Sequence, residues 1–240
     1  GVPAYPTVRD VPGPVDLAVV AVPVGAVPDV VRDCAAKGVR GLVVVSAGFA
    51  ETGPEGRHRQ AELVQVARSN GMRVVGPNCL GVVNNDPKFS LNASMAPVVP
   101  TAGRVGFFSQ SGALGVAILG SVATRGLGLS TFVSAGNRAD VSGNDLLQYW
   151  QDDPATEVVL LYLESLGNPR KFARLARRVA TAKPVVAVKS GRSTQGIPVG
   201  HTVRLTARTP PGFLVVLDGH HPDWTAEDES GPVATLRANG

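Results

Sequence analysis

Three groups of residues have the chemistry to transfer a phosphoryl group if the fold brings them together. The neutral imidazole of His201 can attack phosphorus, and the carboxylate of Glu164 can accept the other ring N–H and fix the tautomer. Residues 109–112, with the sequence SQSG, separate a short apolar run from a run of small residues, which is typical of a strand-to-helix junction. The first N–H groups of a helix have no intrahelical partners, so this junction can hold the transferred phosphate.

Two other interpretations of these residues stay open. The serines can be ordinary helix caps, Glu164 a strand-end carboxylate paired with an arginine, and His201 a surface side chain. Ser111, His201 and an acid could also form a serine-hydrolase triad, but SQSGA is not the G-x-S-x-G sequence of such enzymes. A serine at the start of an apolar helix is also badly placed as a nucleophile, so phosphoryl transfer is favoured over hydrolysis.

A glycine-rich turn, GPNCLG at residues 76–81, follows another apolar run. Its glycines bring the backbone close to a ligand or to a packed neighbour, and Asn78 and Cys79 are presented there. From the residues alone, such a turn is more often only a tight loop with a satisfied asparagine and a small buried cysteine.

Metal and disulfide chemistry are not predicted. His220 and His221 lie in a stretch rich in proline and glycine, with Asp218 and Asp223 nearby, and these side chains are scattered rather than spaced as metal ligands. The two cysteines are too few for a disulfide scaffold and are compatible with a reducing cytoplasm.

The composition is that of a globular protein. The 240 residues are enough for two modest domains, and 44% of them are hydrophobic and 18% charged. The net charge of +4 is dispersed, which suits phosphate-bearing small molecules, and the 5% of aromatic residues are too few for base-stacking surfaces. No apolar run reaches the roughly 18 residues of a membrane span. We therefore expect a cytoplasmic protein with neither a nucleic-acid nor a membrane partner.

The hydrophobic pattern predicts an α/β fold with parallel sheets. Apolar strands alternate with helices from Asp16 onward, as in βαβ units whose strands are buried in a parallel sheet. A proline-containing stretch before residue 103 is typical of a linker. We therefore expect one domain over residues 1–98, a second over residues 101–204, and an irregular tail over residues 205–240 with at most one strand.

Within the second domain, strands are expected near residues 104–109, 129–136, 158–164 and 184–191, and helices near residues 112–125, 143–150 and 169–181. The helix that begins at Gly112 is apolar on nearly every side and is expected to be buried. The helix that begins at Pro169 has one apolar face and one basic face, and we expect the basic face to be solvated. Ligands bind at the carboxyl ends of parallel strands, where every exit here is polar or rich in glycine.

Six stretches, in the same order, resemble the nucleoside-diphosphate-forming acyl-CoA synthetases, the superfamily that includes the α subunit of succinyl-CoA ligase. They are GLVVVSAGFAETG, VVGPNCLGVVN, GRVGFFSQSGALG, STFVSAGNRADV, LLYLES and KPVVAVKSGRS, and with their spacers they cover about residues 1–202. The sequence also resembles actinobacterial members in which this portion is joined to a GNAT acetyltransferase domain.

The resemblance implies a partial CoA-binding Rossmann-like domain followed by a flavodoxin-like ligase-CoA domain. It implies that His201 is the phosphorylated histidine and that Glu164 orients it. It also implies that Ser109, Ser111 and Gly112 bind the phosphate.

The resemblance further implies that Asn78, Cys79 and Gly81 lie beside the thiol end of CoA. The implied reaction forms acyl-CoA reversibly from an acid, CoA and ATP through acyl-phosphate and phosphohistidine intermediates. ATP or ADP and Mg²⁺ would act through an ATP-grasp domain or subunit that exchanges phosphate with the histidine.

The sequence departs from the family pattern in three places. The glycine-rich loop that grips the CoA nucleotide does not occur after Gly1, and the ATP-grasp domain is missing. The Gly-Ala-Leu-Ala that usually follows the histidine is Val203-Arg204-Leu205-Thr206 here. We therefore expect an acid-thiol ligase that is incomplete without an ATP-grasp partner, or an inactive fragment, and in either case a chain that begins inside a domain. The alternative is a non-catalytic module that senses acyl-CoA or a nucleotide and regulates an attached acetyltransferase.

Overall fold

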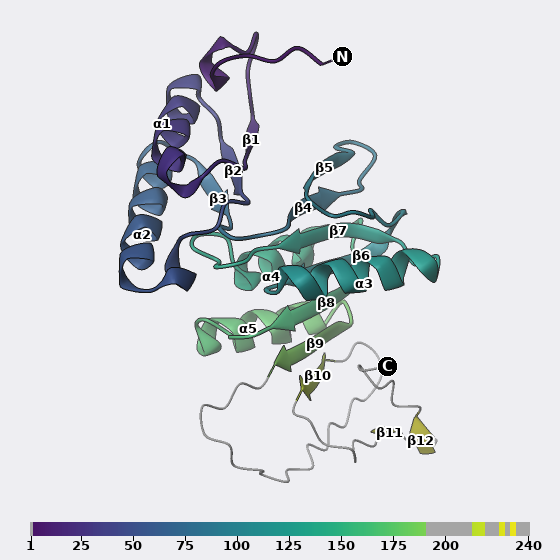
Figure 1. The fold of residues 1–240 in the computed structure, drawn as a ribbon. Helices are drawn as coiled ribbons and strands as arrows, with labels where there is room; N and C mark the ends of the chain where they lie inside the picture. The colour runs from purple at the N-terminus through teal and green to yellow at the C-terminus, as the bar shows by residue number, and fades with distance from the viewer. Residues whose placement is uncertain (1, 191–212, 219–225, 229–230, 234–240) are drawn as a thin grey trace.

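The first 75 residues form alternating strands and helices around a small parallel sheet. The computed structural model describes residues 2–190, 213–218, 226–228 and 231–233. The small sheet has the order β1-β2-β3 and consists of β1 (Leu17–Val20), β2 (Gly41–Val44) and β3 (Arg73–Val75). Two helices, α1 (Val27–Lys37) and α2 (Pro54–Ser69), lie side by side on one face of it (Figure 1). Three short 3₁₀ helices complete this part: η1 (Val8–Asp10), η2 (Val24–Ala26) and η3 (Ala50–Thr52).

The ends of both helices follow from their sequences. α1 ends at Gly38, whose φ of 79° lies in the left-handed region that glycine tolerates, and whose N–H donates to the carbonyl oxygens of Cys34 and Ala35. α2 begins with Pro54, which suits the first turn because the N–H that proline lacks would have no partner there. The apolar faces of both helices pack on the small sheet in a core that includes Val20, Val27, Val31, Leu42, Leu63 and Val74.

A larger sheet of seven strands has the order β10-β9-β8-β6-β7-β4-β5 (Figure 1). Its strands are β4 (Gly81–Asn84), β5 (Leu91–Ser94), β6 (Ala102–Ser109), β7 (Leu129–Ser134), β8 (Val158–Leu163), β9 (Val185–Ser190) and β10 (Phe213–Asp218). The five strands from β10 to β7 are parallel, as predicted for the four strands from β9 to β7, whereas β4 pairs antiparallel with β7 and β5 antiparallel with β4. The β4–β5 hairpin was not anticipated, and it extends the large sheet although it precedes the linker expected before residue 103.

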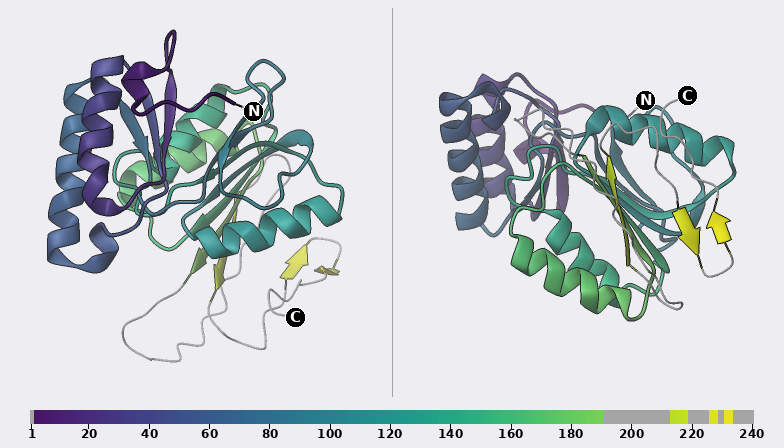
Figure 2. Two further views of the ribbon diagram at one scale, coloured as in Figure 1. Left: turned by 45° about the horizontal axis from the view of Figure 1, so that its top comes forward. Right: turned by 90° about the horizontal axis from the view of Figure 1, so that it is seen from below.

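Helices cover both faces of the large sheet (Figure 2). α3 (Gly112–Thr124) lies on one face, and α4 (Gly143–Asp152) and α5 (Pro169–Ala180) lie on the other. Consecutive residues of β6 serve the two cores, because Phe107 packs in the core under α3 and Phe108 in the core under α4 and α5. Side chains alternate between the faces of a strand, so one strand supports both layers.

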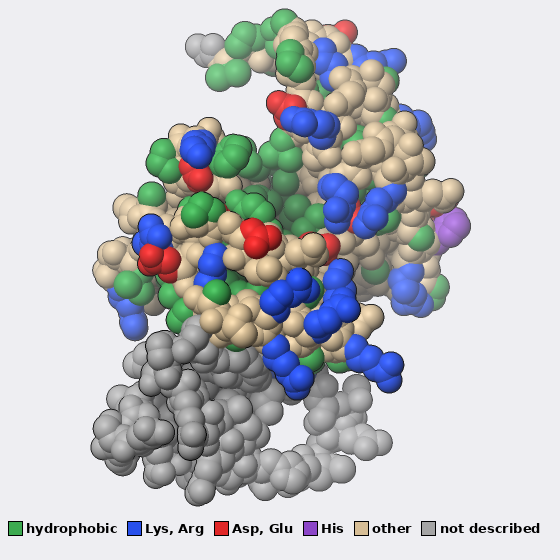
Figure 3. Space-filling model, turned by 180° about the vertical axis from the view of Figure 1, so that it is seen from behind, with side chains coloured by type: hydrophobic (Ala, Val, Ile, Leu, Met, Phe, Trp, Pro, Cys, Tyr) green, Lys and Arg blue, Asp and Glu red, His purple; other side chains and the backbone are tan. Residues whose placement is uncertain are grey.

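The predicted environment of α5 is confirmed, and that of α3 is wrong. The apolar face of α5 is buried through Phe172, Leu175, Ala176 and Val179. Figure 3 shows basic side chains gathered over α5 on the outer surface, and the arginines of its other face are exposed. α3 buries only Gly115, Leu119 and Val122, and it leaves Ala113 and Ala117 exposed. An apolar helix is buried on all sides only under a second layer, and the described residues supply only the sheet beneath it.

The stretch after residue 205 contains more regular structure than expected. β10 coincides with the one strand that the sequence predicts there, FLVVL, and pairs parallel with β9. Two further strands, β11 (Ala226–Asp228) and β12 (Gly231–Val233), form an antiparallel pair. The expectation of at most one strand is therefore wrong.

An ion cluster joins the two sheets close to the candidate site. The side chain of Asp140, in the loop after β7, has no exposed surface and accepts hydrogen bonds from three groups of the small-sheet unit. These are the guanidinium of Arg68, Nε of Arg73 at 2.9 Å and the N–H of Val74 at 2.8 Å. The cluster holds the loop after β7 against β3.

Candidate functional site

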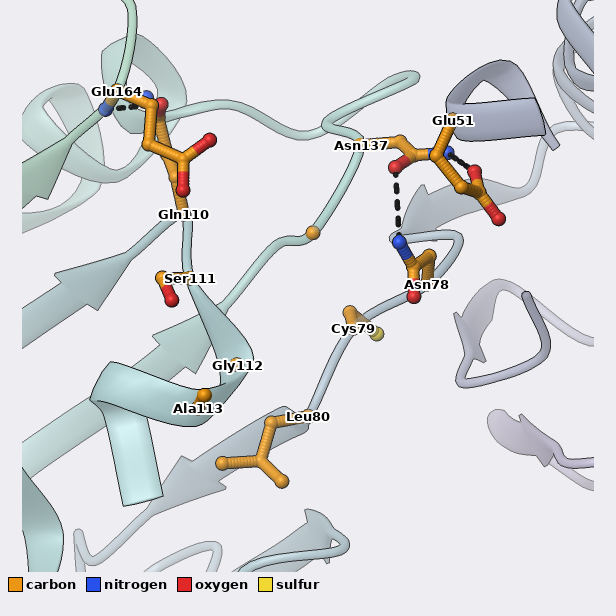
Figure 4. A pocket seen from close by; sticks show the side chains of 11 residues that line it. Glu51, Asn78, Cys79, Leu80, Gln110, Ser111, Gly112, Ala113, Asn137 and Glu164 are labelled. Carbon is orange, nitrogen blue, oxygen red and sulfur yellow. Dashed lines mark hydrogen bonds between the residues drawn. The ribbon is translucent and has the colours of Figure 1, made fainter. Parts of the chain in front are cut away.

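The candidate site is a cavity of about 490 Å³ at the C-terminal ends of β6 and β8 (Figure 4). The β6–α3 junction and Glu164 line one side of it, and residues 78–80 with Glu51 and Asn137 line the other. Parallel α/β sheets bind ligands at this edge. The cavity therefore lies among the strand exits that the sequence marks.

The β6–α3 junction presents hydrogen-bond donors to the cavity. Ser111 caps α3, because its Oγ accepts a hydrogen bond from the N–H of Leu114 at 3.3 Å while its own O–H can still donate. Gly112 and Ala113 line the same cavity, and their first-turn N–H groups have no intrahelical acceptor. Since the N-terminus of a helix also carries a partial positive charge, the junction has the parts of an anion site.

Ser109 lies behind this junction. Its side chain has no exposed surface, and its Oγ donates to the carbonyl oxygen of Ser111 at 2.7 Å. A hydroxyl has one proton to donate, so Ser109 cannot give it to a ligand in this arrangement. Its role here is to hold the turn in shape, which differs from the direct phosphate contact expected from the sequence.

Gln110 fixes the position of Glu164. The side chain of Gln110 is buried, and its Oε1 accepts hydrogen bonds from the N–H groups of Glu164 at 2.7 Å and Ser165 at 3.0 Å. Its Nε2 donates to the carbonyl oxygen of Ser165 at 2.8 Å. Glu164, which directly follows β8, is thus held by its backbone while its side chain reaches the cavity (Figure 4).

The turn at residues 76–81 supplies the opposite wall. The N–H of Asn78 donates to the carbonyl oxygen of Ser46 at 3.0 Å, and its Nδ2 donates to Oδ1 of Asn137 at 3.4 Å. A Cβ on Gly136 would lie 2.0 Å from the carbonyl oxygen of Asn78. The loop after β7 can therefore approach this turn only with glycine at position 136.

Cys79 and Gly81 contribute to the packing of the same turn. Cys79 borders the cavity but is only 7% exposed, its Sγ lies 3.2 Å from the carbonyl oxygen of Val44, and burial raises the pKa of its thiol to about 12. Gly81 is not in the cavity wall. Its φ is 112°, and a Cβ there would lie 2.2 Å from the carbonyl oxygen of Ala93 in β5. The β4–β5 pairing, rather than a ligand, accounts for this glycine.

Two polar residues of the wall, Glu51 and Asn137, were missed as site residues. Nδ2 of Asn137 donates to the carboxylate of Glu51 at 2.5 Å and to Oε1 of Gln60 at 3.0 Å, and Glu51 also accepts from the N–H groups of Gly48 and Phe49. Burial alone would raise the pKa of Glu51, but these hydrogen bonds outweigh it and lower the pKa. Both residues lie in the stretches quoted above, so a signal was present in the sequence.

The structure brings most of the predicted site residues together. Five of them line the cavity: Asn78, Cys79, Ser111, Gly112 and Glu164. The predicted catalytic histidine, His201, lies outside the described residues, as do His220, His221 and Asp223. The described wall can hold an anion at a helix end, beside a carboxylate that is able to orient a base.

Comparison with known proteins divides the chain into two parts. Residues 1–85 match the CoA binding domain family, and residues 102–209 match the succinyl-CoA ligase like flavodoxin domain family. Over 196 residues the chain is 45% identical to acetate–CoA ligase (ADP-forming) I of Archaeoglobus fulgidus. This alignment covers 82% of this chain and 28% of the relative. It is 42% identical to the α subunit of acetate–CoA ligase (ADP-forming) II of Pyrococcus furiosus, in an alignment that covers 82% of this chain and 42% of the relative.

A solved structure has the same fold. Acetyl-coenzyme A synthetase 1 of Candidatus Korarchaeum cryptofilum, solved with phosphate and ADP, superposes with a TM-score of 0.74 at 43% identity. The superposition covers 80% of this chain and 41% of that one, so the chain spans less than half the length of these relatives. The fold is a Rossmann-like CoA-binding domain followed by a flavodoxin-like domain of the succinyl-CoA ligase type. The chain therefore belongs to the superfamily of nucleoside-diphosphate-forming acyl-CoA synthetases.

Proposed function

We propose that this chain is the CoA-ligase part of an ADP-forming acyl-CoA synthetase, which interconverts acyl-CoA, ADP and phosphate with an acid, CoA and ATP. The observation that carries the proposal is the single cavity in which the N-terminus of α3 and Glu164 face the Asn78 turn. Relatives that act as ADP-forming acetate–CoA ligases support the same reaction class. The activity of the whole protein is part of the proposal, because the chain spans less than half of those relatives.

The phosphate side of the wall has two tasks in this reaction. The N–H groups of Gly112 and Ala113, with the O–H of Ser111, hold the phosphoryl oxygens at the positive end of α3. Glu164 accepts the N–H of one ring nitrogen of His201, which leaves the lone pair of the other nitrogen for attack on phosphorus. Ser109 acts through Ser111 rather than on the phosphate.

The reaction in the thioester-cleaving direction has three steps. Phosphate attacks the acyl carbon beside Asn78, so that the C–S bond breaks and CoA leaves as a thiol after protonation. The imidazole of His201 then attacks phosphorus of the acyl phosphate, and the acid leaves as its carboxylate. An ATP-grasp domain or subunit, with Mg²⁺, passes the phosphoryl group to ADP. We assign Cys79 no bond-making step, because its side chain is buried and burial raises the pKa of its thiol to about 12.

Phosphate labelling tests the proposal. The chain is combined with Mg²⁺, γ-labelled ATP and the ATP-grasp subunit of a related synthetase, and acid-labile, base-stable label is expected. His201→Ala abolishes the label. Glu164→Gln slows its appearance about 100-fold, because an amide cannot stabilise a cationic ring. Glu157→Gln removes an exposed carboxylate at the other end of β8 and leaves the label unchanged.

Each other outcome has a distinct meaning. Label that persists in His201→Ala removes that histidine from the mechanism. In a second outcome, the natural chain gains no label, whereas the chain with Gly-Ala-Leu-Ala at residues 203–206 does gain it. That result is consistent with the family assignment and contradicts the activity of this sequence. Calorimetric binding of acyl-CoA with no label in any variant supports the alternative, a non-catalytic sensing module.

A cytoplasmic location and fusion to a GNAT acetyltransferase domain belong to the same proposal. None of the helices in the described part of the chain combines the length and the apolar character that crossing a bilayer requires. Immunodetection of the endogenous protein in cell fractions, on a blot that also gives its full mass, tests both points.

A further inference from the structure

A second cavity, of about 420 Å³, lies on the face of the large sheet that α4 and α5 cover. It shares Gln110 with the catalytic cavity, so this side chain forms a partition between the two. The rest of its wall comes from α2, from the loop after β7, from the end of β8 with the loop that follows it, and from the N-terminal ends of α4 and α5. No step of the proposed reaction uses it.

One of the cations in the second cavity has no carboxylate within salt-bridge distance among the described residues. Arg138 is half-buried, and its Nη1 donates to the carbonyl oxygen of Ser165 at 3.2 Å. It forms no ion pair with a carboxylate of the described chain. Burial lowers the pKa of Arg138, and the charge of Glu164 in the catalytic cavity opposes this only in part. Lys171 of α5, also half-buried, adds a second positive charge to the wall.

The acidic side chains of the same wall are already bound. Asp140 is held by two arginines and a backbone N–H, as described above. Asp145 accepts hydrogen bonds from the N–H and the O–H of Ser142 at 2.9 and 2.6 Å. The charges of the wall that form no salt bridge among the described residues are therefore positive and lie at Arg138 and Lys171.

A buried amide points to a second property of the ligand. Asn144, in the first turn of α4, lines the second cavity and is only 8% exposed. Its Oδ1 has no hydrogen-bond partner among the described residues. A buried acceptor without a partner is unfavourable, and a ligand that carries a hydrogen-bond donor would satisfy it. A hydroxyl suits this ligand better than an ammonium group, because Arg138 and Lys171 line the same cavity and would repel a positive charge.

From these residues we propose that the second cavity binds a small oxyanion that carries a hydroxyl group. Arg138 and Lys171 hold the anionic oxygens, and the hydroxyl donates to Oδ1 of Asn144. Hydrogen phosphate, phosphate monoesters of polyols and hydroxy acids share this chemistry. The site is separate from the phosphate position at the N-terminus of α3.

Titration of the ¹⁵N-labelled chain tests this proposal. The probes are inorganic phosphate, glycerol 3-phosphate, glycerate and sulfate, at pH 7.5 and constant ionic strength. Backbone resonances of Gly143 and Gly167 report on the second cavity, and that of Gly112 reports on the catalytic cavity. We expect saturable shifts at Gly143 and Gly167, with sulfate binding about fivefold more weakly because it has no O–H to donate. The tighter of glycerol 3-phosphate and glycerate assigns the ligand to the phosphate or the carboxylate class.

Variants assign the contacts. Arg138→Gln weakens all probes about tenfold, because a charge-assisted hydrogen bond is lost, and Arg138→Lys retains measurable binding. Asn144→Leu abolishes the preference for hydroxylated probes over sulfate. Arg178→Gln makes the same charge change on the exposed face of α5 and is the matched control, with no effect expected.

Ser111→Asp separates the two cavities, since it suppresses the shift at Gly112 and leaves the shift at Gly143 unchanged. Three results would overturn the proposal: shifts confined to Gly112, equal losses in Arg178→Gln and Arg138→Gln, or equal affinity for sulfate and the hydroxylated probes. The dispersion of each variant's spectrum reports whether it is folded, and Arg138→Lys gives the same test should Arg138→Gln not fold.

Discussion

The side chain of Gln110 accepts a hydrogen bond from the N–H of Glu164 at 2.7 Å, which ties the first residue after β6 to the first residue after β8. The two residues come from neighbouring parallel strands, whose registers place Ser109 beside Tyr162. A carboxylate that must orient a base needs a fixed Cα, and a buried amide with three hydrogen bonds provides it. The glutamine in SQSG thus positions the backbone of Glu164, while Ser111 caps α3 and lines the cavity.

Replacing Gln110 by leucine should affect both stability and reaction rate. The change leaves the N–H groups of Glu164 and Ser165 without their acceptor, so we expect a loss of about 1–3 kcal/mol in the free energy of unfolding. Phosphohistidine formation should slow by more than the change in folded fraction explains. Urea unfolding and the labelling assay measure the two effects. Gln151→Leu, near the end of α4, is the control, and equal effects of the two variants would contradict a positioning role.

Substitutions at Ser111 should separate the hydroxyl from the helix end. Ser111→Ala removes one donor and is expected to weaken phosphate binding by about 1 kcal/mol, roughly fivefold. Ser111→Asp adds a negative charge at the anion position and should weaken it further. Calorimetry with inorganic phosphate measures both effects. Arg138→Gln serves as a common background, because it weakens binding in the second cavity. Ser121→Ala on the exposed side of α3 should have no effect, and unchanged binding in both Ser111 variants would mean that Ser111 is only a cap.

The elements that could be predicted from the sequence are those with a local cause. The β6–α3 junction combines an apolar run, a capping serine and a run of small residues, and α5 combines Asn168 and Pro169 at its start with a clear apolar face. The strand exits were marked by their polar and glycine residues. Each of these signals lies within about ten residues of sequence. The ends of the helices predicted from them agree with the structure to within two residues.

What could not be predicted depends on contacts between distant segments. The bond from Asn137 to Glu51 joins residues 86 positions apart, and neither residue indicates the other. Gly81 carries a signal for close approach, but only the β4–β5 pairing shows that a strand, rather than CoA, is what approaches. The burial of Ser109 likewise depends on the turn around it. Residue type thus indicated where close contacts occur, but only the tertiary structure shows which segment is the contact partner.

Two glycine substitutions should have opposite effects on stability. Gly136→Ala places a Cβ 2.0 Å from the carbonyl oxygen of Asn78, at a φ of 49°, so we expect a loss of about 2–4 kcal/mol and a displaced Asn78 turn. Gly120→Ala in the middle of α3 meets no atom within 4 Å and should stabilise the fold by about 0.5–1 kcal/mol. Thermal unfolding of both variants measures the effects. Equal stability of Gly136→Ala and the natural chain would mean that the two loops are not in contact.

The cysteines should be unreactive in the folded protein. Burial raises the pKa of Cys79 to about 12, and burial with the nearby charge of Asp33 raises that of Cys34. The thiolate is the reactive form, so at pH 8 we expect Cys79 to react with a disulfide reagent about 1,000-fold more slowly than a free cysteine. The chain unfolded in urea is the control and should show two fast thiols. Fast reaction of Cys79 in the folded chain would mean that the Asn78 turn opens readily.

The ion cluster at Asp140 should give the protein an acid-dependent stability. Burial alone would raise the pKa of Asp140, but hydrogen bonds from Arg73, the N–H of Val74 and Arg68 outweigh it and lower the pKa. A carboxyl whose pKa is lower in the folded than in the unfolded state stabilises the fold above its unfolded pKa of about 3.9. This contribution is lost as the pH falls through the lowered pKa of the folded state.

Asp140→Asn should therefore lower the free energy of unfolding by about 1.5–3 kcal/mol at pH 7, because hydrogen bonds to a charged group are lost. The difference between the variant and the natural chain should stay constant above about pH 5 and shrink as the pH falls below about 4. Urea unfolding at several pH values between 3 and 7 measures it. Asp29→Asn, which breaks an exposed pair with Arg32, is the control and should change stability by less than about 0.5 kcal/mol. A difference that does not depend on pH would show that the Asp140 carboxylate is not what joins the two sheets, and that the loop after β7 is held by its backbone contacts alone.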